Sequence, residues 1–255
     1  MPSVKEIADE LGIEPVTYRE YRKFIQREDD DSTYHPILQS GRKASYERQA
    51  RMFDGKAMVY TTGIVPVVAS RIAGSSNAIE LGYGTGFRLL CYALNNPETQ
   101  FVGVERNPLS HEIMEARMKR LGISNVKLVD RDIISDISGL RAPCVIGIDV
   151  FGDDDLRFLR YGFGGDPTPF LYGMFSRMID NSQPNFLATT RYGRVGDGDI
   201  IESYLKTIHE AVGISEFESV PFSCTIDDER PKNGFVMFGR KPVQAKPVSE
   251  ETVVA

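Results

Sequence analysis

An acidic residue followed by three glycines is the part of this sequence best suited to hold a ligand. Gly82, Gly84 and Gly86 have G-x-G-x-G spacing between an expected strand and an expected helix. Glycine at such a turn permits positive φ and lets a ligand approach the backbone closely. The N-terminus of the following helix offers unpaired N–H groups and partial positive charge to a carboxylate or phosphate. The spacing alone also fits a turn that only reverses the chain.

Two carboxylates narrow the chemistry of the ligand. Glu80 ends the strand before the glycines, where a negative charge suits an ammonium or sulfonium and repels a pyrophosphate. A dinucleotide site would also need its third glycine where Phe87 stands. Glu105 ends the next strand, where a carboxylate can accept both hydroxyls of a ribose. The combination favours a nucleoside ligand with a cationic end.

The elements that position these residues alternate between strands and helices. The pattern predicts strands at 78–81, 101–105, 126–129, 144–148, 185–189, 218–224 and 234–239, and helices at 87–94, 108–121, 168–179 and 199–212. The last two strands have no helix between them, which indicates an antiparallel hairpin. We therefore expect an α/β fold: a doubly wound, mostly parallel seven-stranded sheet ending in that hairpin.

Three regions are expected along the chain. Residues 1–76 form a helical N-terminal extension or lid, with helices at 4–11 and 16–25 and a short helix at 46–52. Residues 77–241 form the main α/β domain, and residues 242–255 a disordered polar tail.

Composition bounds the function further. The formal net charge is −6, which removes a general electrostatic argument for a nucleic-acid partner. No apolar run is long enough for a transmembrane helix and the N-terminus lacks the apolar core of a signal peptide, so a cytoplasmic location without membrane attachment is expected. A homodimer is left open.

Three segments together resemble the first three motifs of the class I S-adenosylmethionine-dependent methyltransferases. They are Glu80-Leu-Gly-Tyr-Gly-Thr-Gly86, Phe101-Val-Gly-Val-Glu105 and Asn125-Val-Lys-Leu-Val-Asp-Arg-Asp132. The resemblance implies a Rossmann-like domain that binds S-adenosylmethionine through Glu80, Gly82, Tyr83, Gly84, Gly86, Glu105, Arg106, Asp132, Ile133 and Asp149. Within this set, Asp132 would meet the adenine amino group with Ile133 against the ring, and Asp130 is the alternative to Asp132.

The motifs stop at the fourth strand. It is followed by Asp149-Val-Phe-Gly-Asp153, without the Asn/Asp-Pro-Pro-Tyr segment of enzymes that methylate exocyclic amines. The stretch 82–132 resembles the tRNA guanine-N7 methyltransferases, but their Pro-Asp-Pro-Trp-type segment is missing and the chain has no tryptophan. Asp149 and Asp153 are two carboxylates without further ligands and would make a poor magnesium site, so no metal is expected.

The prediction is therefore a methyltransferase acting on a small molecule. Asp149 is the candidate general base, and the acceptor is expected near Tyr60, Phe151, Arg191 and Tyr192. The alternatives are an RNA or protein methyltransferase, or a non-catalytic protein that binds S-adenosylmethionine.

Overall fold

The elements of the chain follow one another as the alternating pattern predicts. The structure, a computed structural model, describes residues 2–17, 19–21, 23–24, 43–133, 139–148, 173, 175–179, 185–192, 203, 206–207, 210, 213–214, 216–224 and 232–241. Its helices are α1 (Val4–Leu11), α3 (Lys43–Ile72), α4 (Phe87–Asn95) and α5 (Pro108–Leu121). Its strands are β1 (Asn77–Leu81), β2 (Gln100–Glu105), β3 (Val126–Asp130), β4 (Cys144–Ile148), β5 (Phe186–Tyr192), β6 (Glu216–Cys224) and β7 (Lys232–Arg240).

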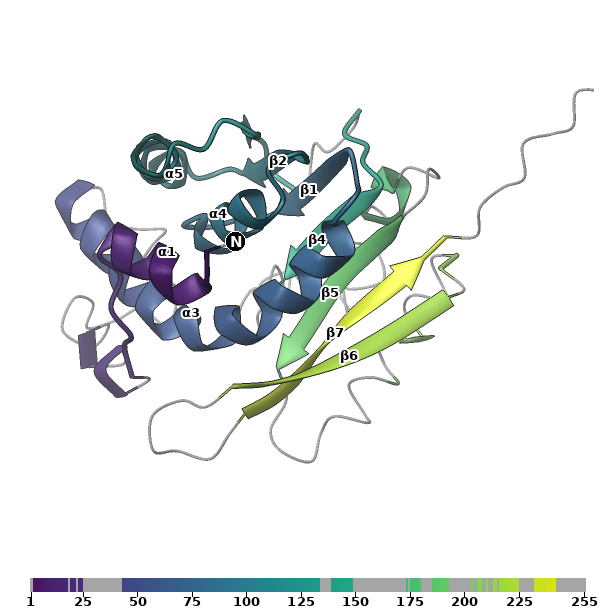
Figure 1. Ribbon diagram of the computed structural model, residues 1–255, viewed down its shortest axis with the longest axis horizontal. Helices are drawn as coiled ribbons and strands as arrows, with labels where there is room; N and C mark the ends of the chain where they lie inside the picture. The colour runs from purple at the N-terminus through teal and green to yellow at the C-terminus, as the bar shows by residue number, and fades with distance from the viewer. Residues whose placement is uncertain are drawn as a thin grey trace, which may run out of the picture.

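The strands form one seven-stranded sheet in the order β3-β2-β1-β4-β5-β7-β6. The first five run parallel, and β7 pairs antiparallel with both β5 and β6 (Figure 1). The predicted fold class, including the closing hairpin, is confirmed. The order reverses between β1 and β4, and ligands of doubly wound sheets bind beyond the carboxyl ends of the strands at such a switch point.

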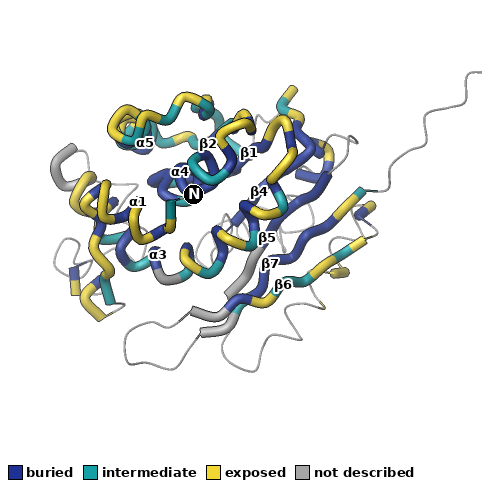
Figure 2. The backbone as a smooth tube through the Cα atoms, viewed as in Figure 1, coloured by how far each residue is buried: buried dark blue, intermediate teal, exposed yellow. Residues whose placement is uncertain are grey.

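Alternate residues of the central strands point to two different cores. Ala78 belongs to a cluster that includes side chains from α1, α3, α4 and α5, whereas its neighbour Ile79 packs with Phe175 and Met178 in a second cluster. Strand β4 is buried along its whole length and β1 from Ala78 to Leu81, as a sheet covered on both faces requires (Figure 2). Helices α3 and α4 therefore lie on one face, and residues 175–178 on the other.

The N-terminal extension contains a helix much longer than the sequence pattern indicates. The helix predicted at 46–52 is present but its predicted length is wrong, because α3 runs for 30 residues. Pro66 and two glycines interrupt the local pattern, but Pro66 lies on the exposed side. One stripe of the helix is buried at the three- and four-residue steps that a helical face needs: Ala50, Asp54, Met58, Thr61, Val65, Val68 and Ile72. Burial of that stripe outweighs the local propensity.

The remaining predicted elements agree with the structure where it describes them. Residues 19–21 and 23–24 are helical, as are 173 and 175–178 on the way to β5 and residues 203, 206, 207 and 210 before β6. The tail at 242–255 lies outside the described residues. Among the helices described, none combines the length and hydropathy that a membrane crossing needs.

Candidate functional site

The turn between β1 and α4 uses glycine for two different reasons. Gly82, Gly84 and Gly86 have φ of 60°, 58° and 78°, the left-handed region that other residues rarely adopt. A Cβ on Gly86 would overlap the Met114 sulfur, so this glycine lets α5 pack against the turn. A Cβ on Gly84 would meet nothing within 4 Å, so the backbone there faces open space. The turn is thus closed on the α5 side and open where a ligand would lie.

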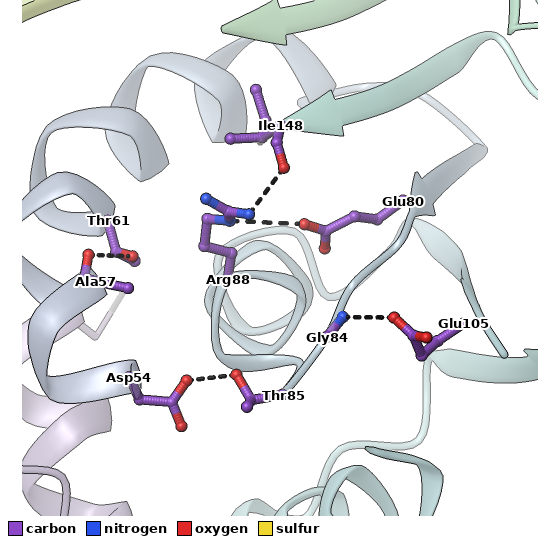
Figure 3. A network of polar contacts seen from close by, with 9 residues as sticks. All are labelled: Asp54, Ala57, Thr61, Glu80, Gly84, Thr85, Arg88, Glu105 and Ile148. Carbon is purple, nitrogen blue, oxygen red and sulfur yellow. Dashed lines mark hydrogen bonds and ion pairs between the residues drawn. The ribbon is translucent and has the colours of Figure 1, made fainter. Parts of the chain in front are cut away.

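Glu80 is a buried carboxylate next to this turn. Its side chain is 2% exposed; Oε1 lies 3.8 Å from the Nε of Arg88, and Oε2 has no hydrogen-bond partner among the described residues. Burial raises the pKa of Glu80 to about 7, while the Arg88 guanidinium acts to lower it. Arg88 also donates from Nη2 to the carbonyl of Ile148 at 2.9 Å, which ties α4 to the end of β4 (Figure 3). One carboxylate oxygen therefore remains for a cationic partner.

Glu105 is held at the end of β2 by backbone N–H groups. Its Oε2 accepts from the amide of Gly84 at 3.1 Å (Figure 3), and its Oε1 accepts from the amides of Arg106 at 2.9 Å and Asn107 at 3.1 Å. The Nε2 of His111 lies 2.8 Å from the carbonyl oxygen of Glu105. A carboxylate offers about four acceptor sites, so this one is fixed in place and still has capacity for a hydroxyl donor.

The two acids after β3 differ in their surroundings. Asp130 is exposed at the last position of β3, whereas Asp132 is partly buried and its Oδ2 lies 3.3 Å from the Nη1 of Arg106. Ile133 packs against the second core cluster. Three of the predicted cofactor residues, Arg106, Asp132 and Glu105, thus lie together along the ends of β2 and β3.

Three residues outside the sequence-based prediction stand beside the turn. Asp54 of α3 accepts a hydrogen bond from the hydroxyl of Thr85 (Figure 3). Arg117 of α5 donates from Nη2 to Asp54 Oδ2 at 2.6 Å and from Nη1 to the carbonyl of Thr85 at 2.9 Å. Arg88, described above, is the third. A signal was present for each, because Asp54 and Arg117 are charged residues on buried helical stripes and Arg88 is a cation in the first turn of a helix.

The other predicted site residues either pack in the core or have side chains outside the described part of the structure. Tyr83 is buried, packs over the position of Gly103 and lies edge-on to His111 with ring centroids 5.7 Å apart. Tyr60 is a partly buried residue of α3 that packs against the first core cluster. Arg191 and Tyr192 extend the backbone of β5, but their side chains lie outside what is described, as do Asp149 and Phe151. Within the described part of the chain, no three His, Cys, Asp or Glu side chains gather as a metal site would require.

The seven-stranded sheet, parallel apart from its antiparallel end, has the Rossmann-like fold found in class I S-adenosylmethionine-dependent methyltransferases. Residues 75–143 match a family described as "Putative methyltransferase". The match covers about a quarter of the chain, so in this segment and in its fold the chain is similar to the class I methyltransferases.

Individual relatives are distant. A tRNA (guanine-N(7)-)-methyltransferase of Thiobacillus denitrificans is 26% identical over 131 residues, which cover 49% of this chain and 56% of the relative. The chain thus spans about half the length of that curated relative. The mitomycin 7-O-methyltransferase MmcR superposes with a TM-score of 0.58 at 13% identity, over 92% of this chain and 67% of the other. A precorrin-6y C5,15-methyltransferase of Geobacter metallireducens gives 0.50 at 14% identity, over 70% and 88%. These two likenesses concern the fold.

Proposed function

We propose that the chain is a methyltransferase that uses S-adenosylmethionine as methyl donor. The observation that carries the proposal is the buried Oε2 of Glu80, which lacks a partner among the described residues and lies beside a glycine turn with open space at Gly84. A buried carboxylate oxygen is costly unless it is paired, and an ammonium group is a matching partner. The residues present therefore fit the methionine end of this cofactor.

Each described residue has a specific task in this proposal. Glu80 and the turn from Gly82 to Gly86 hold the methionine end, and the carboxylate of Glu105, fixed by three backbone amides, receives a ribose hydroxyl. Asp132 with Ile133 takes the adenine end, since Asp132 is linked to the Glu105 strand end through Arg106 and Asp130 is exposed.

When bound, S-adenosylmethionine supplies a methyl group activated by a positively charged sulfur. The protein's contribution is to align the acceptor with that carbon and to exclude water, and such positioning can supply on the order of 7–11 kcal/mol in favourable cases. Asp149, the next residue in the sequence after β4, stays our candidate base for an acceptor that must lose a proton.

We consider two classes of methyl acceptor, a small molecule and RNA. A small molecule is the acceptor expected from the sequence, and the net charge of −6 supports it. The relative named as a tRNA (guanine-N(7)-)-methyltransferase favours RNA instead, and we put RNA first because this match is one of sequence and not of fold alone. Neither proposal needs a metal.

Cofactor binding is tested by calorimetry with S-adenosylmethionine, S-adenosylhomocysteine and NAD. We expect both methionine-derived ligands to bind and NAD not to bind; NAD binding alone would refute the proposal. The acceptor is tested by transfer of a labelled methyl group to total tRNA and to a pool of small metabolites. An RNA acceptor should also give affinity that falls steeply with salt. Cofactor binding with no transfer to either pool would indicate the non-catalytic alternative.

A further inference from the structure

A buried ionic cluster connects the N-terminal extension to the glycine turn. Asp54, Thr85 and Arg117 come from α3, the turn and α5, and they are 1%, 3% and 9% exposed. Asp54 receives hydrogen bonds from both of the others, and Arg117 also donates to the Thr85 carbonyl. Thr85 thus contacts both Asp54 and Arg117, and these two residues also contact each other.

That residue, Thr85, is held at its hydroxyl and at its backbone carbonyl. Thr85 lies between Gly84 and Gly86, with its hydroxyl on Asp54 and its carbonyl on Arg117. Because the peptide unit is planar, fixing the Thr85 carbonyl also fixes the direction of the Gly86 N–H, which donates to the Tyr83 carbonyl at 2.9 Å. On its other side, Gly84 donates to Glu105. The cluster therefore determines how the turn presents its backbone.

Packing alone does not explain why Asp54 and Arg117 are charged residues. Two ions are expensive to bury, and well-packed apolar residues of similar volume often serve stability equally well. Each charge here instead makes a directed hydrogen bond to the turn. Glycines of positive φ have the widest conformational freedom when nothing fixes them, so an external clamp has an evident use.

We propose that Asp54 is a positioning residue for cofactor binding, acting through Thr85 with Arg117 as its counter-ion. The N-terminal helix α3 is then a part of the cofactor site and supplies its clamp from outside the Rossmann-like strands and helices. This inference rests on the proposed function, since the ligand that the turn holds is S-adenosylmethionine.

The first test compares two substitutions of the same residue. Thr85→Val removes the hydroxyl at nearly constant volume and leaves the ion pair between Asp54 and Arg117 intact, whereas Thr85→Ser keeps the hydroxyl. We expect Thr85→Val to weaken S-adenosylmethionine binding by about tenfold or more, equivalent to about 1.4 kcal/mol, and Thr85→Ser to bind within about twofold of the native protein. Calorimetry well below the unfolding temperature measures both.

Asp54→Asn, alone and combined with Thr85→Val, completes a double-mutant cycle. Thr85→Val removes the hydrogen bond that Asp54→Asn deprives of its charge, so their effects on affinity should be smaller together than the sum of the two separately. Glu218→Gln is the matched control: Glu218 pairs with Arg71, which joins the same helix α3 to β6 at a place away from the turn. Its cofactor affinity should equal that of the native protein.

A readout without cofactor separates this inference from the proposed function. Amide exchange of Gly84 and Gly86 in the cofactor-free protein should accelerate in Thr85→Val and Asp54→Asn, and stay unchanged in Glu218→Gln. Unchanged exchange and unchanged affinity in folded Thr85→Val would overturn the inference, even if Asp54→Asn lowers the melting temperature. Failure of the native protein to bind S-adenosylmethionine would overturn the proposed function, whereas the exchange result would still decide whether Asp54 fixes the turn.

Discussion

The buried carboxylate of Glu80 should make both stability and cofactor binding depend on pH. Burial raises its pKa from the ordinary 4.5 to about 7, so the folded protein retains the proton more strongly than the unfolded chain. Folded-state stability therefore falls as pH rises from about 4.5, and the whole penalty is present above about 7. The two pKa values correspond to a penalty of about 3 kcal/mol.

Glu80→Gln isolates this penalty because glutamine has nearly the same shape and does not titrate. The difference in unfolding free energy between the variant and the native protein should shift in favour of the variant by up to about 3 kcal/mol between pH 5 and pH 8. Other titrating groups occur in both proteins, so they cancel in the difference. Urea unfolding of the cofactor-free proteins at several pH values measures it.

Cofactor binding should have the opposite dependence. If the ammonium of S-adenosylmethionine needs the ionised Glu80, binding below pH 7 releases a proton from this residue. The affinity should then fall by up to about tenfold for each unit by which the pH is lowered below 7. Calorimetry from pH 5 to 7.5, in buffers of different ionisation enthalpy, gives both the affinity and the proton released. In Glu80→Gln the affinity should be low and flat with pH. A native affinity that is flat over this range, or a Gln variant that binds as tightly as the native protein at pH 7.5, would refute the reasoning.

Three further changes test neighbouring parts of the site. Glu105→Ala should weaken cofactor binding by at least about tenfold, because the ribose loses its carboxylate. The variant should also melt at a somewhat lower temperature, because three backbone amides lose their acceptor. Unchanged affinity in calorimetry would mean that Glu105 does not bind the ribose. Gly86→Ala should destabilise the fold more than Gly84→Ala, since both strain a positive φ at about 1–3 kcal/mol but only the former enters space filled by α5; equal melting temperatures would contradict this. Arg88→Met removes the cation that opposes the raised pKa of Glu80, so the pH at which cofactor affinity reaches its plateau should move upward in the same calorimetric series.

The conformation of the glycine turn can be predicted from the sequence because its determinants are local. Gly82, Gly84 and Gly86 must take positive φ whatever packs around them, and Glu80 and Glu105 lie at strand ends that the β-pattern already marks. The topology follows from the alternation of strands and helices and from the final hairpin. The turn and the strand ends depend on neighbours within a few residues, whereas the topology follows from the general rules for connecting parallel strands.

The length of α3 is not evident from local patterns. Pro66, Gly55 and Gly63 each lower local helix propensity, so a short helix is the better local interpretation. The buried stripe from Ala50 to Ile72 stabilises the helix against α4 and the sheet, and its spacing is present in the sequence. It is obscured because the stripe includes Asp54 and Thr61, polar residues in otherwise apolar positions.

The polar residue Asp54 on the buried stripe of α3 carries functional information. A carboxylate on the buried stripe of a helix must find a partner, because an unpaired buried charge is too costly to keep. Arg117 is the corresponding cation on the buried stripe of α5, in phase with Ser110 and Met114. Pairing such exceptions across helices would predict the contact between α3 and α5 from the sequence alone. Since Thr85 lies inside that contact, the residues that break the helical pattern are also those that hold the turn.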